Sequence, residues 1–133
     1  LHYSGLPWQA APSAAKAGVD ALSNVICVEL GPFGVRSNCI APGFIAGTEG
    51  ASRLVPKGSD DMVKAFIPAQ RIGERTDIAN AAVFLFSEAA NWITGQVIAV
   101  DGGQMHFRSA WLTYPQSSLD PRSFKNLFPD LRL

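Results

Sequence analysis

The sequence is short of cysteine, has no excess charge of either sign and contains no long apolar run. Its 133 residues include only two cysteines, Cys27 and Cys39, which have neither metal-ligand spacing nor the context of a secreted disulfide framework, so we expect two buried thiols. Eleven basic residues balance eleven acidic ones without a basic block, which argues against nucleic acid or an anionic membrane as a partner. No apolar run approaches the roughly 18 residues of a membrane span. These absences favour a small-molecule ligand.

What the sequence does contain is enough apolar material for one domain. Hydrophobic residues make up 47% of the chain, so a single core can form. The chain begins with Leu1 rather than Met and enters on Leu-His-Tyr-Ser-Gly, as though in the middle of an element. We therefore expect it to be a piece of a longer protein.

The first two elements are predicted to be a helix and a strand. A helix is predicted over residues 12–30, because apolar residues recur at three- and four-residue steps between a Pro12-Ser13 start and a Gly31-Pro32 stop. Residues 35–41 are short, largely apolar and closed by Pro42-Gly43. This pattern is typical of a strand in a parallel sheet that is buried on both faces.

A long loop and two further helices follow. Residues 43–58 are rich in glycine and predict a loop of the length that usually binds a ligand. Ser59 is expected to cap a short helix that runs to about Phe66, and Thr76 to cap a helix that ends near Asn91. In the second of these helices four apolar residues are predicted to share one face: Ile78, Ala82, Leu85 and Phe86.

A second buried strand is predicted over residues 96–100, closed by the turn Asp101-Gly102-Gly103. Strand, helix and strand in this order indicate the right-handed parallel crossover of α/β proteins. After Gly103 the period is lost, and residues 104–133 are predicted to form an irregular tail. The fold class is therefore α/β with a parallel sheet.

Five short motifs, in order along residues 11–103, resemble the C-terminal half of a short-chain dehydrogenase/reductase. They are Ser-Ala-Ala-Lys16-Ala-Gly, Arg36-Ser-Asn-Cys-Ile-Ala-Pro-Gly43, Arg71-Ile-Gly, Asp77-Ile-Ala and Thr94-Gly-Gln-Val-Ile-Ala-Val-Asp-Gly-Gly103. The resemblance implies the C-terminal half of a doubly wound, Rossmann-type domain whose N-terminal half is absent from this chain. It assigns residues 1–103 to the dinucleotide-binding domain, with residues 43–68 as substrate-binding loop and short helix.

One departure from the family narrows the resemblance. Family members usually have a tyrosine four residues before the lysine, where the cation lowers the phenol pKa for proton donation, but here that position is Pro12. The phrase Pro42-Gly-Phe-Ile-Ala-Gly-Thr48-Glu-Gly50 with Arg53-Leu54 resembles the 2,4-dienoyl-CoA reductases, and the opening His2-Tyr3 resembles their fungal peroxisomal members. The resemblance implies NADPH-dependent reduction of 2,4-dienoyl-CoA to 3-enoyl-CoA in β-oxidation of unsaturated fatty acids.

The resemblance also assigns roles to individual residues. Lys16 would bond the nicotinamide ribose and stabilise the dienolate by its charge, Tyr3 is a candidate proton donor, and Arg53 would pair with coenzyme A phosphates. The residues that would wrap the nicotinamide are Pro42, Gly43, Phe44, Ile45, Ala46, Gly47 and Thr48. The plainer alternatives are a solvated lysine, a strand-end aromatic, a solvent-facing arginine and an ordinary turn. No metal site is predicted.

The resemblance implies a homo-oligomer when the domain is complete, and an inactive, aggregation-prone chain without its missing half. The ending Leu131-Arg132-Leu133 partly matches the peroxisomal import signal, so a peroxisomal location is expected, with the cytoplasm as the alternative. Two rival functions stay open. One is a non-catalytic interaction protein built on the reductase fold, and the other is a reductase of a different enoyl thioester.

Overall fold

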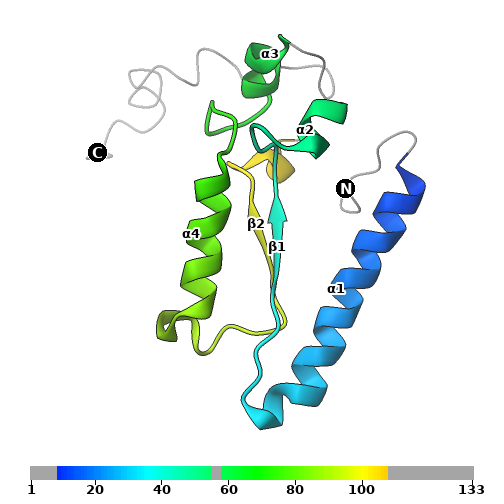
Figure 1. Cartoon of the computed structure of the whole chain (residues 1–133), viewed down its shortest axis with the longest axis vertical. Helices are drawn as coiled ribbons and strands as arrows, with labels where there is room; N and C mark the ends of the chain where they lie inside the picture. Colours follow the sequence, from blue (N-terminus) through cyan, green and yellow to red (C-terminus); the bar gives the residue numbers. More distant parts are fainter. Residues whose placement is uncertain (1–8, 55–57, 108–133) are drawn as a thin grey trace, which may run out of the picture.

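The computed structural model describes residues 9–54 and 58–107, and of residues 52–54 it describes the backbone alone. In chain order its elements are α1 (Ala10–Leu30), β1 (Cys39–Pro42), α2 (Glu49–Leu54), α3 (Asp60–Ala65), α4 (Arg75–Phe86) and β2 (Val97–Val100). Short 3₁₀ helices lie at Gly31–Phe33, Glu88–Ala90 and Gln104–His106. In Figure 1, α1 and α4 flank the two strands on opposite sides. The 3₁₀ helix Gln104–His106 begins the segment 104–133 that was predicted as an irregular tail. Residues 108–133 of that segment lie outside the described part.

The two strands pair in parallel, with Cys39 opposite Val97 and Pro42 opposite Val100. Helix α4 connects them and packs on both. A parallel pair needs such a crossover connection, because the chain must return to the same end of the sheet. The predicted α/β class with a parallel sheet is thus confirmed.

The strands are shorter than predicted at their N-terminal ends. Residues 35–38 precede β1, and Gln96 precedes β2. Side chains make the contacts that a ladder would otherwise make: the Asn38 amide donates to the Ile93 carbonyl at 2.8 Å, and its oxygen accepts from the Gln96 N–H at 3.0 Å. Polar side chains before β1 therefore replace strand pairing there.

Helix α4 differs from its prediction at both ends. Its N-cap is Glu74, which forms a reciprocal capping box with Asp77, so the assignment of Thr76 as the cap is wrong. The helix ends at Phe86 rather than near Asn91, and the Ser87 hydroxyl donates to the Phe84 carbonyl at 2.7 Å. Phe86 is 88% exposed, so it does not share the buried face with Leu85.

The segment predicted as a loop contains a helix. Helix α2 begins directly after Thr48, whose hydroxyl accepts a hydrogen bond from the Ala51 N–H at 3.2 Å. A threonine that caps a helix with an acid in its first turn is a helix-start signal that the glycine content obscured. At α3, Ser59 is the N-cap as predicted, but its backbone carbonyl rather than its hydroxyl makes the bond, accepting from Val63 at 3.0 Å.

The core of the described residues is small. Its buried apolar side chains are Ile45, Val63, Ile67, Leu85 and Ala90. The strand residues are half-buried or exposed rather than buried on both faces, and Cys27 and Cys39 are half-buried rather than buried, so these predictions are wrong for the chain as described. A two-stranded sheet has no inner strand, which explains the exposure.

Candidate functional site

The carboxyl ends of β1 and β2 meet at one edge of the sheet. The Gly43 N–H donates to the Val100 carbonyl at 3.1 Å, directly after β1. A Cβ placed on Gly43 would lie 2.8 Å from both Cα and Cβ of Asp101. Only glycine fits such an approach, so the Pro42-Gly43 turn is fixed against the residue that follows β2. In open α/β sheets this edge is where ligands bind.

Beyond the turn, the chain pairs with the loop before α4. The Gly73 N–H donates to the Phe44 carbonyl at 2.9 Å, and the Ala46 N–H donates to the Gly73 carbonyl at 2.8 Å. Ile45, between them, is 7% exposed. The Ile45 N–H belongs to the same trans peptide group as the Phe44 carbonyl and points in the opposite direction, so it faces away from Gly73.

The Ile45 N–H has no acceptor among residues 9–54 and 58–107, although the Ile45 carbonyl accepts from the Thr48 hydroxyl at 2.9 Å. Buried backbone donors are nearly always paired, so an unpaired one at the ligand-binding edge of a sheet is suited to a ligand acceptor. Such a donor suits an amide carbonyl. The structure thus gathers the predicted segment 42–48 into one turn at this edge.

The far side of the turn is held by helix α4 and by Thr48. The Arg75 guanidinium, in the first turn of α4, donates to the Gly47 carbonyl. The Thr48 hydroxyl both donates to Ile45 and accepts from Ala51, so it is engaged within the protein. The turn is therefore held at several points rather than left free.

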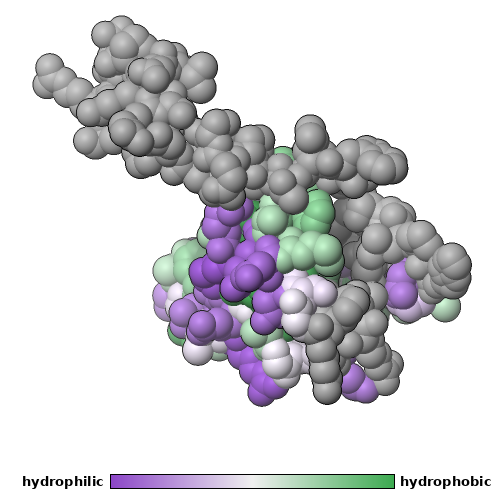
Figure 2. Space-filling view, turned by 90° about the horizontal axis from the view of Figure 1, so that it is seen from above, coloured by the Kyte–Doolittle hydropathy of each residue, from purple (hydrophilic) through white to green (hydrophobic). Residues whose placement is uncertain are grey.

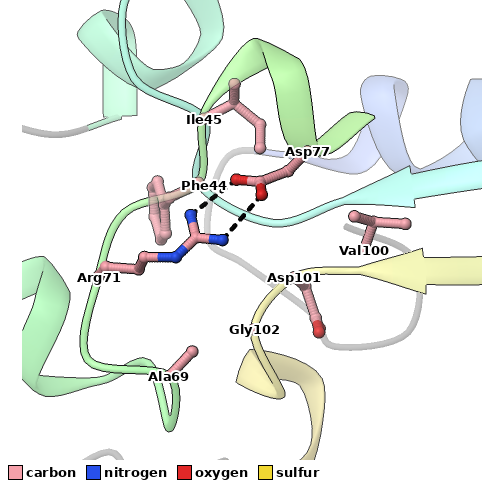
Figure 3. Close-up of a pocket in the computed structure, with 9 residues that line it drawn as sticks. Phe44, Ile45, Ala69, Arg71, Asp77, Val100, Asp101 and Gly102 are labelled. Atoms are coloured by element: carbon pink, nitrogen blue, oxygen red, sulfur yellow. Dashed lines mark hydrogen bonds and ion pairs between the residues drawn. The ribbon is translucent and has the colours of Figure 1, made fainter. Parts of the chain in front are cut away.

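A pocket of about 90 Å³ lies beside the turn. It is lined by Phe44, Ile45, Ala69, Arg71, Gly73, Asp77, Val100, Asp101 and Gly102. Figure 3 shows Arg71 reaching toward Asp77 beside Phe44. Both carboxylate oxygens of Asp101 are engaged within the chain, one by the Gly103 N–H at 2.9 Å and the other by the Met105 N–H at 2.8 Å. Asp101 thus holds the turn after β2.

Arg71 and Asp77 form a two-pronged ion pair, with both nitrogen–oxygen distances 2.7 Å. The Arg71 hydrogen bond, followed by one from the Glu74 N–H, holds the pKa of Asp77 well below its usual range, and the same pair raises the pKa of Arg71. The sequence motifs contained both residues, but sequence reasoning gave neither a role. The sequence signal that could have predicted this ion pair is an arginine six positions before an acid in the first turn of a helix.

The structure does not bring the other predicted site residues into contact with the turn in the part that it describes. Lys16 lies in the second turn of α1, whose N-terminal end is at the same end of the molecule as the carboxyl ends of the strands (Figure 1). Its side chain is exposed and bonds none of the residues that the structure describes. Arg53 lies in α2, but its side chain is outside the described part, as are Tyr3 and the ending Leu131-Arg132-Leu133.

Seen from this end, hydrophilic and hydrophobic surfaces lie next to each other (Figure 2). Within the described ranges no cluster of three or more histidine, cysteine or acidic side chains could hold a metal ion. No helix of the same ranges is long and apolar enough to cross a membrane. The site therefore offers backbone donors and a mixed polar and apolar surface.

Comparison with known proteins gives consistent matches. The family model described as enoyl-(acyl carrier protein) reductase matches residues 2–105. The chain is 53% identical over 106 residues to a peroxisomal 2,4-dienoyl-CoA reductase of Saccharomyces cerevisiae, a match that covers 80% of this chain and 36% of that protein.

Solved structures agree. An oxidoreductase of the short-chain dehydrogenase/reductase family from Burkholderia thailandensis superposes with a TM-score of 0.67 at 34% identity, covering 79% of this chain and 41% of that one. ElxO with NADP bound gives a TM-score of 0.67 at 33% identity, covering 79% and 43%.

The chain spans about 36% of the length of the first curated relatives that it matches, as expected for part of a Rossmann-type domain. The parallel sheet with its crossover helix, the turn at the carboxyl edge and the family match over residues 2–105 agree with one another. The chain belongs to the short-chain dehydrogenase/reductase family.

Proposed function

We propose that this chain is part of an NADPH-dependent reductase that converts 2,4-dienoyl-CoA to 3-enoyl-CoA. The observation that carries the proposal is the 53% identity to a protein named as a peroxisomal 2,4-dienoyl-CoA reductase. The second support is Pro12, which stands where the family's usual proton-donating tyrosine would be. A chain with proline there lacks that donor for carbonyl reduction, whereas reduction of a conjugated thioester does not need to protonate an alkoxide.

The geometry of the carboxyl edge fits a nicotinamide cofactor. The Ile45 N–H, which has no acceptor among the residues that the structure describes, would donate to the nicotinamide carboxamide, and the turn that follows Pro42 is held in place by Gly73 and Arg75. Neighbouring structures with NADP and NADPH bound support this choice of cofactor. Thr48 would stand at the pyrophosphate end of the turn.

When bound, NADPH would supply a hydride to the distal carbon of the diene. Lys16 would bond the nicotinamide ribose hydroxyls, and its positive charge would stabilise the negative charge that develops on the thioester oxygen. Tyr3 is the candidate donor of the proton that the α-carbon takes up. Arg53 would pair with coenzyme A phosphates.

The test is NADPH oxidation by the full-length protein with a 2,4-dienoyl-CoA substrate. Lys16→Ala should lower kcat by about 100-fold or more, and Arg53→Ala should raise KM with little change in kcat. Arg36→Ala, before β1 and outside the predicted binding segment, is the matched control and should leave both constants unchanged. A full-length protein that neither turns over the substrate nor binds NADPH would sink the proposal.

The description of the matching family model favours a second candidate, a reductase of other enoyl thioesters. The same assay with a 2-enoyl thioester separates the two, because only one substrate class should give efficient turnover. Relatives named as peroxisomal reductases support a peroxisomal location, which a fluorescent fusion of the full-length protein would test. A homo-oligomer, supported by the exposed apolar residues of α1, would be tested by light scattering of the same protein.

A further inference from the structure

We propose that Arg71 and Asp77 are a positioning pair that sets the place of the Phe44–Gly47 turn, and through it the affinity for the nicotinamide cofactor. This inference rests on the proposed function. The printed hydrogen bonds of the two side chains go to each other and to the loop of residues 71–74, not to the turn itself.

The pair closes the loop that precedes α4. Asp77 receives Arg71 through both oxygens at 2.7 Å, and one of these oxygens also accepts the Glu74 N–H at 2.7 Å. One carboxylate therefore ties together both ends of the stretch 71–74. Gly73 lies inside this closed stretch.

Gly73 is the contact between the closed loop and the turn. Both of its backbone groups bond the turn, to Phe44 and to Ala46. A Cβ at this position would lie 2.7 Å from the Ile45 side chain, so glycine allows the two backbones to approach. The position of Gly73 thus determines the position of Ile45 and of its N–H, which has no acceptor in the described part of the chain.

The contribution of the pair to positioning should exceed its contribution to stability. The Arg71 and Asp77 side chains are 58% and 29% exposed, and ion pairs of such exposure stabilise folded proteins little. A bidentate arginine–carboxylate pair nevertheless fixes geometry, since its two parallel bonds allow one arrangement. A pair kept only for stability would lower the melting temperature and leave the NADPH affinity unchanged, whereas loss of this pair should lower the affinity with little change in melting temperature.

The test uses the full-length protein and three readouts: the Kd for NADPH by fluorescence titration, the melting temperature, and hydrogen exchange of the Ala46 and Gly73 amides. Arg71→Ala and Asp77→Asn should each weaken NADPH binding on the order of tenfold and speed exchange at both amides. Arg71→Lys, which keeps the charge but not the two-pronged geometry, should restore little of the affinity.

The matched control is Arg36→Ala, which removes a single hydrogen bond to the Ile93 carbonyl at 3.4 Å, before β1 and outside the predicted binding segment. It should leave both exchange and affinity unchanged. Unaltered exchange at Ala46 and Gly73 in Arg71→Ala would overturn the positioning role, and so would faster exchange with unaltered NADPH affinity. If Arg71→Ala fails to fold, Asp77→Asn and Arg71→Lys carry the same test.

Failure of the proposed function gives a different result. Wild-type protein that does not bind NADPH, while Arg71→Ala still speeds exchange at the two amides, would overturn the cofactor part of the inference together with the proposed function. It would leave the structural coupling between the two loops demonstrated.

Discussion

Two helices flank the sheet, and they are held in different ways. Helix α4 packs on both strands and buries Leu85, because the strands that it connects are both present. Among the described residues, helix α1 contacts the segments beside the strands through polar groups in its second half, such as the Ser23 and Ser37 hydroxyls at 2.8 Å and the Thr94 hydroxyl with the Cys27 sulfur at 3.3 Å. Its apolar residues are largely exposed, and Leu22, for example, is 59% exposed. Helical periodicity thus predicts an apolar face, but only the neighbouring elements decide whether that face is buried.

The largest expected effect compares one leucine from each helix. Leu85→Ala in this chain should lower the free energy of unfolding by about 2–5 kcal/mol, because it leaves a cavity in the core. Leu22→Ala should change it by less than about 0.5 kcal/mol, because the side chain is exposed. Urea denaturation of both variants checks the pair. Equal losses would break the comparison and mean that the α1 face is covered.

A comparison of two glycines should give opposite signs. Gly43→Ala should destabilise by about 1–3 kcal/mol, because the new methyl group would lie 2.8 Å from the Asp101 backbone. Gly18→Ala should stabilise by about 0.5–1 kcal/mol, because nothing lies within 4 Å and alanine favours the helix. Thermal melts of the two variants measure both signs. A neutral Gly43→Ala would contradict the close packing at the carboxyl edge.

The smallest expected effect is the pH dependence that Asp77, in the first turn of α4, gives to the free energy of unfolding. The pKa of Asp77 is depressed in the folded state, so its contribution to stability is complete above its ordinary pKa of about 4 and is lost as pH falls through the lower folded value. Asp77→Asn should therefore flatten the stability profile below about pH 4. Denaturation at a series of acidic pH values measures this, and an unchanged acid slope would show that the ion pair contributes nothing there.

The sequence predicted the fold class and the helix of residues 12–30 well, because local period and turn residues determine both. It missed α2, since a glycine-rich stretch conceals the capping role of Thr48. It also misassigned the cap of α4, because Thr76 is a commoner capping residue than Glu74 and only the geometry of Asp77 identifies Glu74 as the cap.

For the site, the sequence could indicate the turn 42–48 but not what holds it. The contacts of Gly73 and Arg75 with the turn join residues about thirty positions apart, which no local pattern reveals. The roles of Lys16, Tyr3 and Arg53 stay predictions, since they depend on a ligand and on side chains beyond those described here.

The hydrogen bonds of the Asn38 side chain to the segment before β2 have a consequence for folding during translation. The side-chain oxygen of Asn38 accepts a hydrogen bond from the Gln96 N–H, which lies 58 residues later in the chain. At a translation rate of about 5–20 residues per second, β1 leaves the ribosome roughly 3–12 s before β2 can pair with it. During that interval the β2-facing edge of β1 is open to other extended chains, and nascent-chain chaperones that bind such edges would have their longest opportunity here.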